Sequence, residues 1–521
     1  MSTSATAPAA RPVNKWGVAI AVALGALLEV VDTSIVNVAL NDMQNSLGAT
    51  LSEVSWVVSS YAIANVIVLP MTAWLGHRFG KRRYFIFSLV GFTVASVLCG
   101  LSTTLPMLVV ARVLQGLTGG GLLAKAQAYL YETFSVEEQP MAQAFFGAVV
   151  IAGPAIGPTL GGFLVTNVDW RWIFFINVPV AMIAVPLALT FLPRDAPDPH
   201  AKPVDWTSIA LLAIGIGSLQ TFLEEGYSED WFESHMIVAL AVTTVVGLVA
   251  FVYRQLKSKD PVVDLRVLRH RSLAAGSLLS IVIGMALYGA LFSIPIFTQS
   301  MLHYTSEDTG FLLLPSALVA AAMMPVVGRL VRRFDPRIVL VCGALILAFA
   351  MHMLTGLTPQ TGEGDLLTPL MIRAIGTTMM FLPLNLATLG PIPREDVGAA
   401  SGLFNLTRQL GGSIGVALLS TLLGQRQAFH RAVLVEHIAP GAPDTVARLA
   451  GYAQAFVAKG IPLQEAQHKA LALLDGMVQQ QAAVMSFADT FWATGALILA
   501  TLPLVLLLGK PRKGAAPVAA H

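Results

Sequence analysis

Charged residues are scarce in this sequence. Asp, Glu, Lys and Arg make up only 12 % of the 521 residues, whereas about 25 % is usual in a soluble globular domain. The 32 basic and 30 acidic residues leave a net charge of +2, so no excess of either sign points to nucleic acid or to an acidic partner. This composition excludes a soluble enzyme.

Motifs that carry chemistry are also few. The two cysteines, Cys99 and Cys342, cannot form a disulfide framework or a cysteine metal cluster. No grouping of His, Cys and Asp has the spacing of metal ligands, and the sequence has no Gly-x-x-x-x-Gly-Lys-Ser/Thr loop for nucleotide phosphates. We therefore expect no enzymatic activity, no metal, no cofactor and no use of ATP.

Apolar residues are abundant, at 55 % of the chain, and they run together in long blocks. A helix needs about 20 such residues to cross a hydrocarbon core about 30 Å thick. Fourteen blocks reach this length, which predicts an all-α integral membrane protein. The expected spans lie near 17–40, 53–75, 84–102, 106–131, 141–165, 170–192, 205–223, 235–254, 272–298, 308–331, 338–357, 366–390, 398–424 and 486–508.

The distribution of Lys and Arg predicts the orientation of these spans, because cytoplasmic loops carry an excess of basic residues. The clusters at Arg78–Arg83, Arg266–Arg271 and Arg332–Arg337 all fall on the side of the N-terminus. The short loops on the opposite side contain neither Lys nor Arg. We therefore expect both termini in the cytoplasm and the long segment 425–485 outside it.

The fourteen spans divide into six, two and six. The basic loop at 76–83 has a loose echo at 328–335, which indicates two parallel six-helix repeats, although basic loops alone would give the same echo. The expected organisation is a cytoplasmic tail at 1–16, an N-terminal half at 17–192, a linker with two inserted helices at 193–271, a C-terminal half at 272–508 and a cytoplasmic tail at 509–521.

Two carboxylates lie inside the first predicted span. Glu29 and Asp32 share one helical face with Gly25, and charges in a membrane are costly enough to suggest function. Desolvation and mutual repulsion both disfavour their ionisation, so the pair can hold and release a proton. Arg112 of the fourth predicted span lies at a similar depth and is the expected partner. The alternative is an ion pair that serves assembly alone.

The roles of the other polar residues in the spans are predicted from their positions along the helices. Lys125 lies lower in the fourth span and is expected to reach the cytoplasmic interface. In the thirteenth span, Arg408 lies near mid-depth, with Gly411 and Gly415 as a small-residue contact. Arg373 of the twelfth span lies nearer the outside. We expect the substrate cavity to include Glu29, Asp32, Gln115, Asn405 and Arg408.

Glycine and proline recur in the fifth predicted span. The glycines at intervals of four residues let a neighbouring helix approach closely, and the prolines each remove a backbone donor and bend the helix. This pattern is suited to alternating access, although simple packing would explain it equally well. The residues concerned are Gly153, Pro154, Gly157, Pro158, Gly161 and Gly162.

The segment 425–485 interrupts the membrane pattern. Gly460 and Pro462 separate two helix-like pieces, and an apolar stripe is expected along the second piece. Such an amphipathic hairpin would cap the molecule or dock a partner. The expected stripe consists of Leu463, Ala466, Ala470, Leu473 and Met477.

Five motifs together resemble the fourteen-span drug:proton antiporters of the major facilitator superfamily, nearest the EmrB-like multidrug exporters. Residues 32–40 (Asp-Thr-Ser-Ile-Val-Asn-Val-Ala-Leu) are similar to the family's first-span signature. Residues 112–116 resemble its proton-coupling motif, and 153–162 its antiporter motif. Residues 170–179 and 405–415 look like further hallmarks of this branch.

The resemblance implies a major facilitator fold and proton-driven efflux of amphipathic toxic compounds, in which Asp32, Glu29 and Arg112 couple the protons. It also implies a bacterial inner membrane location, with a possible periplasmic adaptor and outer-membrane channel as partners. Three alternatives stay open. They are a dedicated exporter of one metabolite such as a siderophore or fatty acid, a channel or sensor without proton coupling, and a membrane enzyme.

The sequence departs from the family pattern at three places, one of them Asn41, where the family often has Pro. The loop between the second and third spans normally holds an aspartate that helps to latch the outward-facing state, and His77 stands there instead, so this latch is weakened or built differently. Glu29 is an additional carboxylate, which would favour cationic substrates or a second proton. The loop residues expected to form the latch are Gly76, His77, Arg78, Gly80, Lys81 and Arg82.

Overall fold

A computed structural model describes residues 14–195, 204–438 and 442–508 of the chain. Within these residues every regular element is a helix. Most of the two tails expected at 1–16 and 509–521 lies outside the described residues, as does part of the linker expected after 193. The expected division into tails, halves and linker stays a prediction.

The first part of the chain forms twelve consecutive helical elements. Several predicted spans consist of more than one of them, because glycine or 3₁₀ turns interrupt the helix. The elements are α1 (Lys15–Ile35), η1 (Val36–Ala39), α2 (Leu40–Leu47), α3 (Leu51–Val68), η2 (Leu69–Met71), α4 (Thr72–Phe79), α5 (Lys81–Gly100), α6 (Leu105–Gly119), α7 (Leu122–Thr133), α8 (Gln139–Asn167), α9 (Trp172–Phe175) and α10 (Asn177–Phe191).

The remaining elements include the longest helices of the chain. They are α11 (Trp206–Glu225), η3 (Trp231–Glu233), α12 (His235–Lys257), η4 (Leu265–Arg269), α13 (Arg271–Met301), α14 (Ser306–Arg333), α15 (Pro336–Leu354), α16 (Glu363–Leu389), α17 (Val397–Glu436), α18 (Pro443–Ala458), α19 (Leu463–Ala500) and η5 (Leu502–Leu507).

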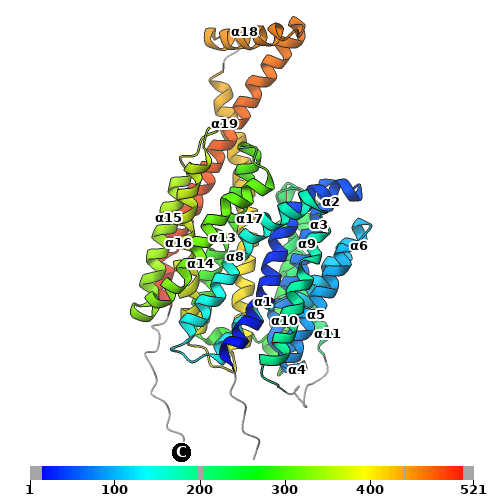
Figure 1. Cartoon of the computed structure of the whole chain (residues 1–521), viewed down its shortest axis with the longest axis vertical. Coiled ribbons are helices and arrows are strands. Elements are labelled where there is room, and N and C mark those ends of the chain that lie inside the picture. The colour runs from blue at the N-terminus through cyan, green and yellow to red at the C-terminus, as the bar shows by residue number, and fades with distance from the viewer. Residues whose placement is uncertain (1–13, 196–203, 439–441, 509–521) are drawn as a thin grey trace, which may run out of the picture.

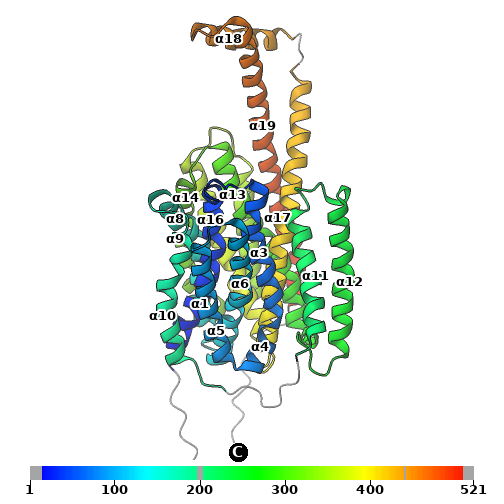
Figure 2. The same ribbon diagram turned by 90° about the vertical axis from the view of Figure 1, so that its right-hand side faces the viewer.

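The helices form two bundles that stand side by side (Figure 1). The bundle of α1 to α10 meets the bundle of α13 to α19 chiefly where α8 packs along α14. The pair α11 and α12 stands at one edge, where α11 contacts α3 and α17 (Figure 2). Functional side chains at the meeting of the two bundles therefore come from α1, α7, α8, α14, α16 and α17.

Twelve helices among the described residues are long and apolar enough to cross a membrane. The spans expected near 272–298 and 398–424 coincide with α13 and α17, which are not among these twelve. These two helices pack closely against each other, since a Cβ added at Gly411 would lie 2.6 Å from Ile281 Cα. The small-residue contact expected at Gly411 is therefore present, and the count of fourteen spans stays a prediction.

The outer hairpin, which we define as residues 425–485, is continuous with the bundle. Helix α17 runs 40 residues without a break and α19 runs 38, and both project beyond the other helices, with α18 lying across their outer ends (Figures 1 and 2). The segment is therefore built largely from extensions of two bundle helices.

The apolar stripe predicted along α19 was partly wrong. Leu463, Leu473 and Met477 are exposed. The residues on the buried face recur every four positions. Two of them, Leu474 and Val478, each lie one position after a predicted residue. The buried face consists of Ala466, Ala470, Leu474 and Val478.

Candidate functional site

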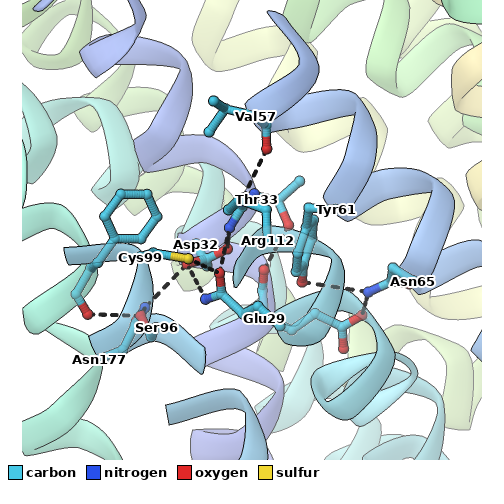
Figure 3. A network of polar contacts seen from close by, with 12 residues as sticks. Glu29, Asp32, Thr33, Val57, Tyr61, Asn65, Ser96, Cys99, Arg112 and Asn177 are labelled. Atoms are coloured by element: carbon cyan, nitrogen blue, oxygen red, sulfur yellow. Dashed lines mark hydrogen bonds and ion pairs between the residues drawn. The ribbon is translucent and has the colours of Figure 1, made fainter. Parts of the chain in front are cut away.

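A buried ion pair joins α1 to α6 in the N-terminal bundle. Arg112 Nη1 lies 2.6 Å from Asp32 Oδ2, and the side chains of Arg112 and Asp32 are 1 % and 0 % exposed (Figure 3). Arg112 also donates through Nε to the carbonyl of Val57 at 2.9 Å, and its guanidinium lies 4.2 Å from the centre of the Tyr61 ring. The partnership expected from the depths of the two residues is therefore present.

The second oxygen of Asp32 is also saturated with donors. Gln115 Nε2 donates to Asp32 Oδ1 at 2.8 Å, and Asn177 Nδ2 donates to the same oxygen at 3.1 Å. Asn177 in turn donates to Ser96 Oγ at 2.9 Å. Helices α1, α5, α6 and α10 thus meet at one carboxylate, and its buried charge is compensated by a guanidinium and two amide donors.

Glu29 belongs to a separate network on the same helix. Asn65 Nδ2 donates to its Oε1 at 2.8 Å (Figure 3). The backbone N–H of Leu123 donates to its Oε2 at 2.7 Å. The two carboxylates were expected to act on each other as a pair. Each is instead held by its own donors, so the two carboxylates belong to separate hydrogen-bond networks.

A break in the fourth predicted span creates the backbone donor for Glu29. The span divides into α6 and α7 at Gly120 and Gly121, and Gly121 has a φ of +72°. The first N–H groups of a helix have no partner inside it and carry partial positive charge. Leu123 is the second residue of α7, so its N–H is free to bind a carboxylate. The run of three glycines at 119–121 was the signal in the sequence.

The prediction that Lys125 reaches the cytoplasmic interface was wrong. Its side chain is buried, donates to Ser88 Oγ at 2.6 Å and lies 4.1 Å from the centre of the Tyr84 ring. A hydroxyl and an aromatic face on α5 satisfy the ammonium inside the bundle, which removes the need to extend toward water.

The glycine and proline motif of α8 packs on the opposite face of α1. A Cβ added at Gly153 would lie 2.6 Å from Val30 Cγ1, and one added at Gly157 would overlap Ser34 Oγ. The same addition at Gly161 would lie 2.7 Å from Ile35 Cγ1. The glycines therefore bring the backbone of α8 against the helix that carries Glu29 and Asp32.

The end of this motif reaches the second bundle. A Cβ added at Gly162 would lie 3.2 Å from the Cα of Glu307 at the start of α14. Pro154 and Pro158 lie inside α8, and Pro154 faces the cavity between the bundles. Helix α8 thus lies between the carboxylate-bearing helix and the other half of the molecule.

A cavity of about 810 Å³ lies between the two bundles. Of the five residues expected in the substrate cavity, Arg408 lines this one, whereas Glu29, Asp32 and Gln115 lie within the N-terminal bundle. Arg373 also lines it, from α16. The walls combine apolar side chains with two arginines.

The bundles are also joined by amide side chains, among them Asn405, which was expected in the substrate cavity, and Gln127 and Asn385, which the sequence analysis did not single out. Gln127 Nε2 donates to Asn385 Oδ1 at 2.7 Å, and Asn405 Nδ2 donates to Gln127 Oε1 at 2.8 Å. Ser401 Oγ donates to the carbonyl of Ala124 at 2.9 Å. Amides inside apolar blocks were the available signal, because polar side chains within a membrane tend to bond across helices.

The loop expected to act as a latch joins α4 to α5 at Gly80, which has a φ of +87°. Lys81 Nζ donates to Glu132 Oε1 at 2.7 Å, and the backbone N–H of Arg82 donates to Asp195 Oδ1 at 3.1 Å. The acidic partners of this loop thus come from α7 and from the end of the first half, which is an arrangement different from an aspartate at position 77.

The other latch residues lie around the same turn. Gly76 and His77 line a pocket of about 480 Å³ together with Glu132 and Glu395. The guanidinium of Arg78 lies 5.6 Å from the centre of the Trp74 ring. The turn therefore faces residues of both bundles.

Comparison with known proteins was made for the whole chain. Residues 22–416 match the family model described as "Major Facilitator Superfamily". The chain is 32 % identical over 496 residues to the "Multidrug export protein EmrB" of Haemophilus influenzae, covering 95 % of this chain and 96 % of that protein. It is 31 % identical over 494 residues to the "Fatty acid resistance protein FarB" of Neisseria gonorrhoeae, covering 95 % and 96 %.

A solved structure has a similar fold. A double Trp mutant of XylE superposes with a TM-score of 0.60 at 13 % identity, covering 96 % of this chain and 97 % of that one.

Proposed function

The chain belongs to the major facilitator superfamily, and from this premise we propose that it exports several amphipathic toxic compounds in exchange for inward-moving protons. The observation that carries the proton coupling is the buried Asp32–Arg112 pair. The similarity to multidrug export proteins over nearly the whole chain supports the drug efflux.

Protonation of Asp32 is the step that links the gradient to movement. Neutralising the carboxylate removes the charge that Arg112 faces at 2.6 Å, and an unpaired buried guanidinium is strongly unfavourable. Helices α1 and α6 therefore rearrange when the proton binds. Because α8 packs tightly on the other face of α1, the rearrangement reaches the interface with α14.

Glu29 is the second proton-binding position. Its partners, Asn65 and the Leu123 N–H, are neutral groups, so protonation there leaves no cation uncompensated in direct contact. We place the primary coupling at Asp32 for this reason and assign Glu29 to a second or alternative proton.

The test is dye transport by purified protein in proteoliposomes under an imposed pH gradient, with a cationic, a neutral and an anionic dye. Wild type and the control Glu138→Gln, at an exposed carboxylate paired with Lys15, are expected to drive dye against its gradient. Asp32→Asn is expected only to equilibrate it. Normal pumping by Asp32→Asn together with failure of Glu29→Gln would move the coupling to Glu29. Indifference of wild type to the gradient for all three dyes would overturn the proposal.

A dedicated exporter of one metabolite is the second candidate. FarB is named for fatty acid resistance and is as similar along its length as the multidrug proteins. Growth inhibition across chemically unrelated toxic compounds separates the two functions, since protection against a single chemical series indicates a dedicated exporter.

We also assign the chain to a bacterial cytoplasmic membrane with fourteen spans and cytoplasmic termini. The test is labelling of single cysteines, in a background without Cys99 and Cys342, by an impermeant maleimide on spheroplasts. Glu229→Cys and Gly451→Cys should react and Ser258→Cys should not. Equal labelling at all three positions would contradict this topology.

The outer hairpin is the segment most accessible to a periplasmic adaptor, because it projects beyond the bundles. Replacing 437–462 with a short Gly-Ser linker should leave dye transport in proteoliposomes intact and abolish resistance in cells. Retained resistance would indicate that the hairpin serves the transporter alone.

A further inference from the structure

The two arginines of the cavity between the bundles lie on one of its walls. The N-terminal bundle contributes apolar groups, among them Val30, Leu123 and Ile151. The C-terminal bundle contributes Arg373 from α16 and Arg408 from α17, together with Phe381 and apolar side chains of α14. A ligand in this space therefore meets apolar groups from both bundles and two guanidinium groups from the C-terminal bundle.

No acidic residue lines the cavity among the described residues. Arg408 donates to Asn405 Oδ1, a neutral amide oxygen, and its guanidinium lies 5.1 Å from the centre of the Phe381 ring. Arg373 is 7 % exposed, makes no hydrogen bond or ion pair with the described residues, and its Nε is buried without an acceptor. Burying such a donor unsatisfied is unfavourable, so Arg373 is a binding group that lacks its acceptor.

The two buried acidic residues of α1, Asp32 and Glu29, already have hydrogen-bond partners of their own. Asp32 is saturated by Arg112, Gln115 and Asn177. Glu29 lies behind Leu123, with its two oxygens held by Asn65 and the Leu123 N–H. Neither carboxylate lines the cavity, so a cationic ligand would find no counter-charge there.

Guanidinium groups have a fixed fork of N–H donors that matches the two oxygens of a carboxylate or sulfonate. We propose that this cavity binds amphipathic organic anions, with the acidic group between Arg373 and Arg408 and the apolar body against the wall of α1, α7 and α8. This assignment rests on the proposed function and names its substrate class. It replaces the expectation that Glu29 selects cations.

The test is equilibrium binding to purified, detergent-solubilised protein by scintillation proximity, which requires no proton gradient. The probes are tritiated 1-pyrenebutyrate, its neutral carboxamide and the corresponding amine, which share one apolar body and differ in charge. Wild type should bind the carboxylate at least about tenfold more tightly than the other two, the size expected for a hydrogen bond to a charged group.

Variants locate the preference. Arg373→Gln and Arg408→Gln should each remove most of the preference for the carboxylate probe. Arg373→Lys should keep part of this preference, because it keeps the positive charge. The control Arg431→Gln removes an exposed arginine of the outer hairpin and should leave the preference unchanged. Size-exclusion profiles identify variants that fail to fold, and Arg373→Lys then carries the comparison.

Two results would overturn the proposal. One is binding of the amide or the amine by wild type as tight as that of the carboxylate, and the other is an unchanged preference in both glutamine variants. Transport of cationic dyes under a pH gradient without binding of the carboxylate would reject the substrate class and keep the exporter. Binding of the carboxylate without gradient-driven transport of any dye would keep the site and reject the exporter.

Discussion

A buried ion pair holds its helices together only while both charges are present. Asp32 and Arg112 lie in the most enclosed part of the N-terminal bundle, where the loss of one partner leaves the other charge without compensation. The proposed coupling uses this property, because neutralising Asp32 would leave Arg112 without its counter-charge.

Arg112→Gln should lower the free energy of unfolding by about 3–5 kcal/mol, because it leaves the Asp32 carboxylate buried and unpaired. Combining it with Asp32→Asn should recover part of this loss. The measurement is denaturant titration of purified protein in mixed micelles. The control Arg431→Gln breaks an exposed pair with Asp475 and should cost about 0–1 kcal/mol. A loss for Arg112→Gln as small as that of the control would contradict the buried pairing.

A substitution at Gly121 tests whether the break between α6 and α7 requires glycine. Its φ of +72° costs a residue with a Cβ about 1–2 kcal/mol, and the added methyl would overlap Thr72 Cγ2. Gly121→Ala should therefore destabilise the protein more than Gly460→Ala, which has a φ of +86° and open space around it. The same denaturant titration compares them, and equal losses would show that the break between α6 and α7 is not tightly packed.

Residue-level predictions from the sequence succeeded where depth along a helix was enough. Asp32 and Arg112 were paired by their positions in two spans. The partners of Glu29 could not be predicted in this way, because they depend on a break that turns a backbone N–H of α7 toward α1. Lys125 was misplaced for a related reason, since its acceptor Ser88 lies on another helix.

Among the elements, α8 is constrained on two sides. Its glycines meet α1 at Val30, Ser34 and Ile35, and its end meets Glu307 of α14. Larger side chains along this face would push α8 away from α1, which carries Glu29 and Asp32, and from α14.

Gly157→Ala should lower the free energy of unfolding by about 1–3 kcal/mol through overpacking against Ser34 and should slow dye transport. The control Gly476→Ala lies in α19 with nothing within 4 Å of the added methyl, and it should be neutral or stabilising by up to about 1 kcal/mol. Unfolding titrations and proteoliposome transport on both variants provide the check. Gly157→Ala with the stability and rate of wild type would mean that α1 and α8 separate easily.

The apolar blocks were enough to predict where helices occur. They did not predict where each helix ends or which face it buries. The outer hairpin shows the difference. Gly460 and Pro462 correctly separated two helices, but the buried face of α19 includes Leu474 and Val478 in place of Leu473 and Met477. A shift of one residue rotates a helical face by about 100°, and only the neighbouring α17 and α18 decide which face is covered.

For the whole molecule, the amide network between the bundles fixes how the two halves meet. Gln127 bonds with Asn385 and Asn405 at once, so one side chain links α7 to both α16 and α17. A rocking of the halves must break these bonds, and each is worth about 1 kcal/mol inside a membrane.

Gln127→Leu should shift the population toward states in which the halves are further apart on this side. The measurement is the distance between spin labels at Glu132→Cys and Glu395→Cys, in a background without the native cysteines, where the mean distance or its spread should increase. Gln467→Leu, the same replacement at an exposed position of α19 in the outer hairpin, is the matched control. Unchanged distances in Gln127→Leu would show that other contacts hold the halves together.

Apolar block length and the repeated basic loop predict two halves with an inserted pair of helices, and that division stays a prediction. The inter-bundle cavity could not be predicted from the sequence. Its arginines come from α16 and α17 and its apolar groups chiefly from α1, α7, α8 and α14, so its composition depends on which faces of six helices converge. Arg408 was singled out because of its depth, and Arg373 received its role only from the fold.

Helix α17 joins the interior of the protein to its outermost part. It carries Ser401, Asn405 and Arg408 near one end and reaches Glu436 at the other, a length of about 60 Å for 40 residues at about 1.5 Å each. If α17 moves as a rigid helix, a tilt of about 10° at the cavity would move its outer end by about 10 Å. An antibody fragment bound to α18 should therefore restrain the movement of α17 and slow transport, although it binds far from the cavity.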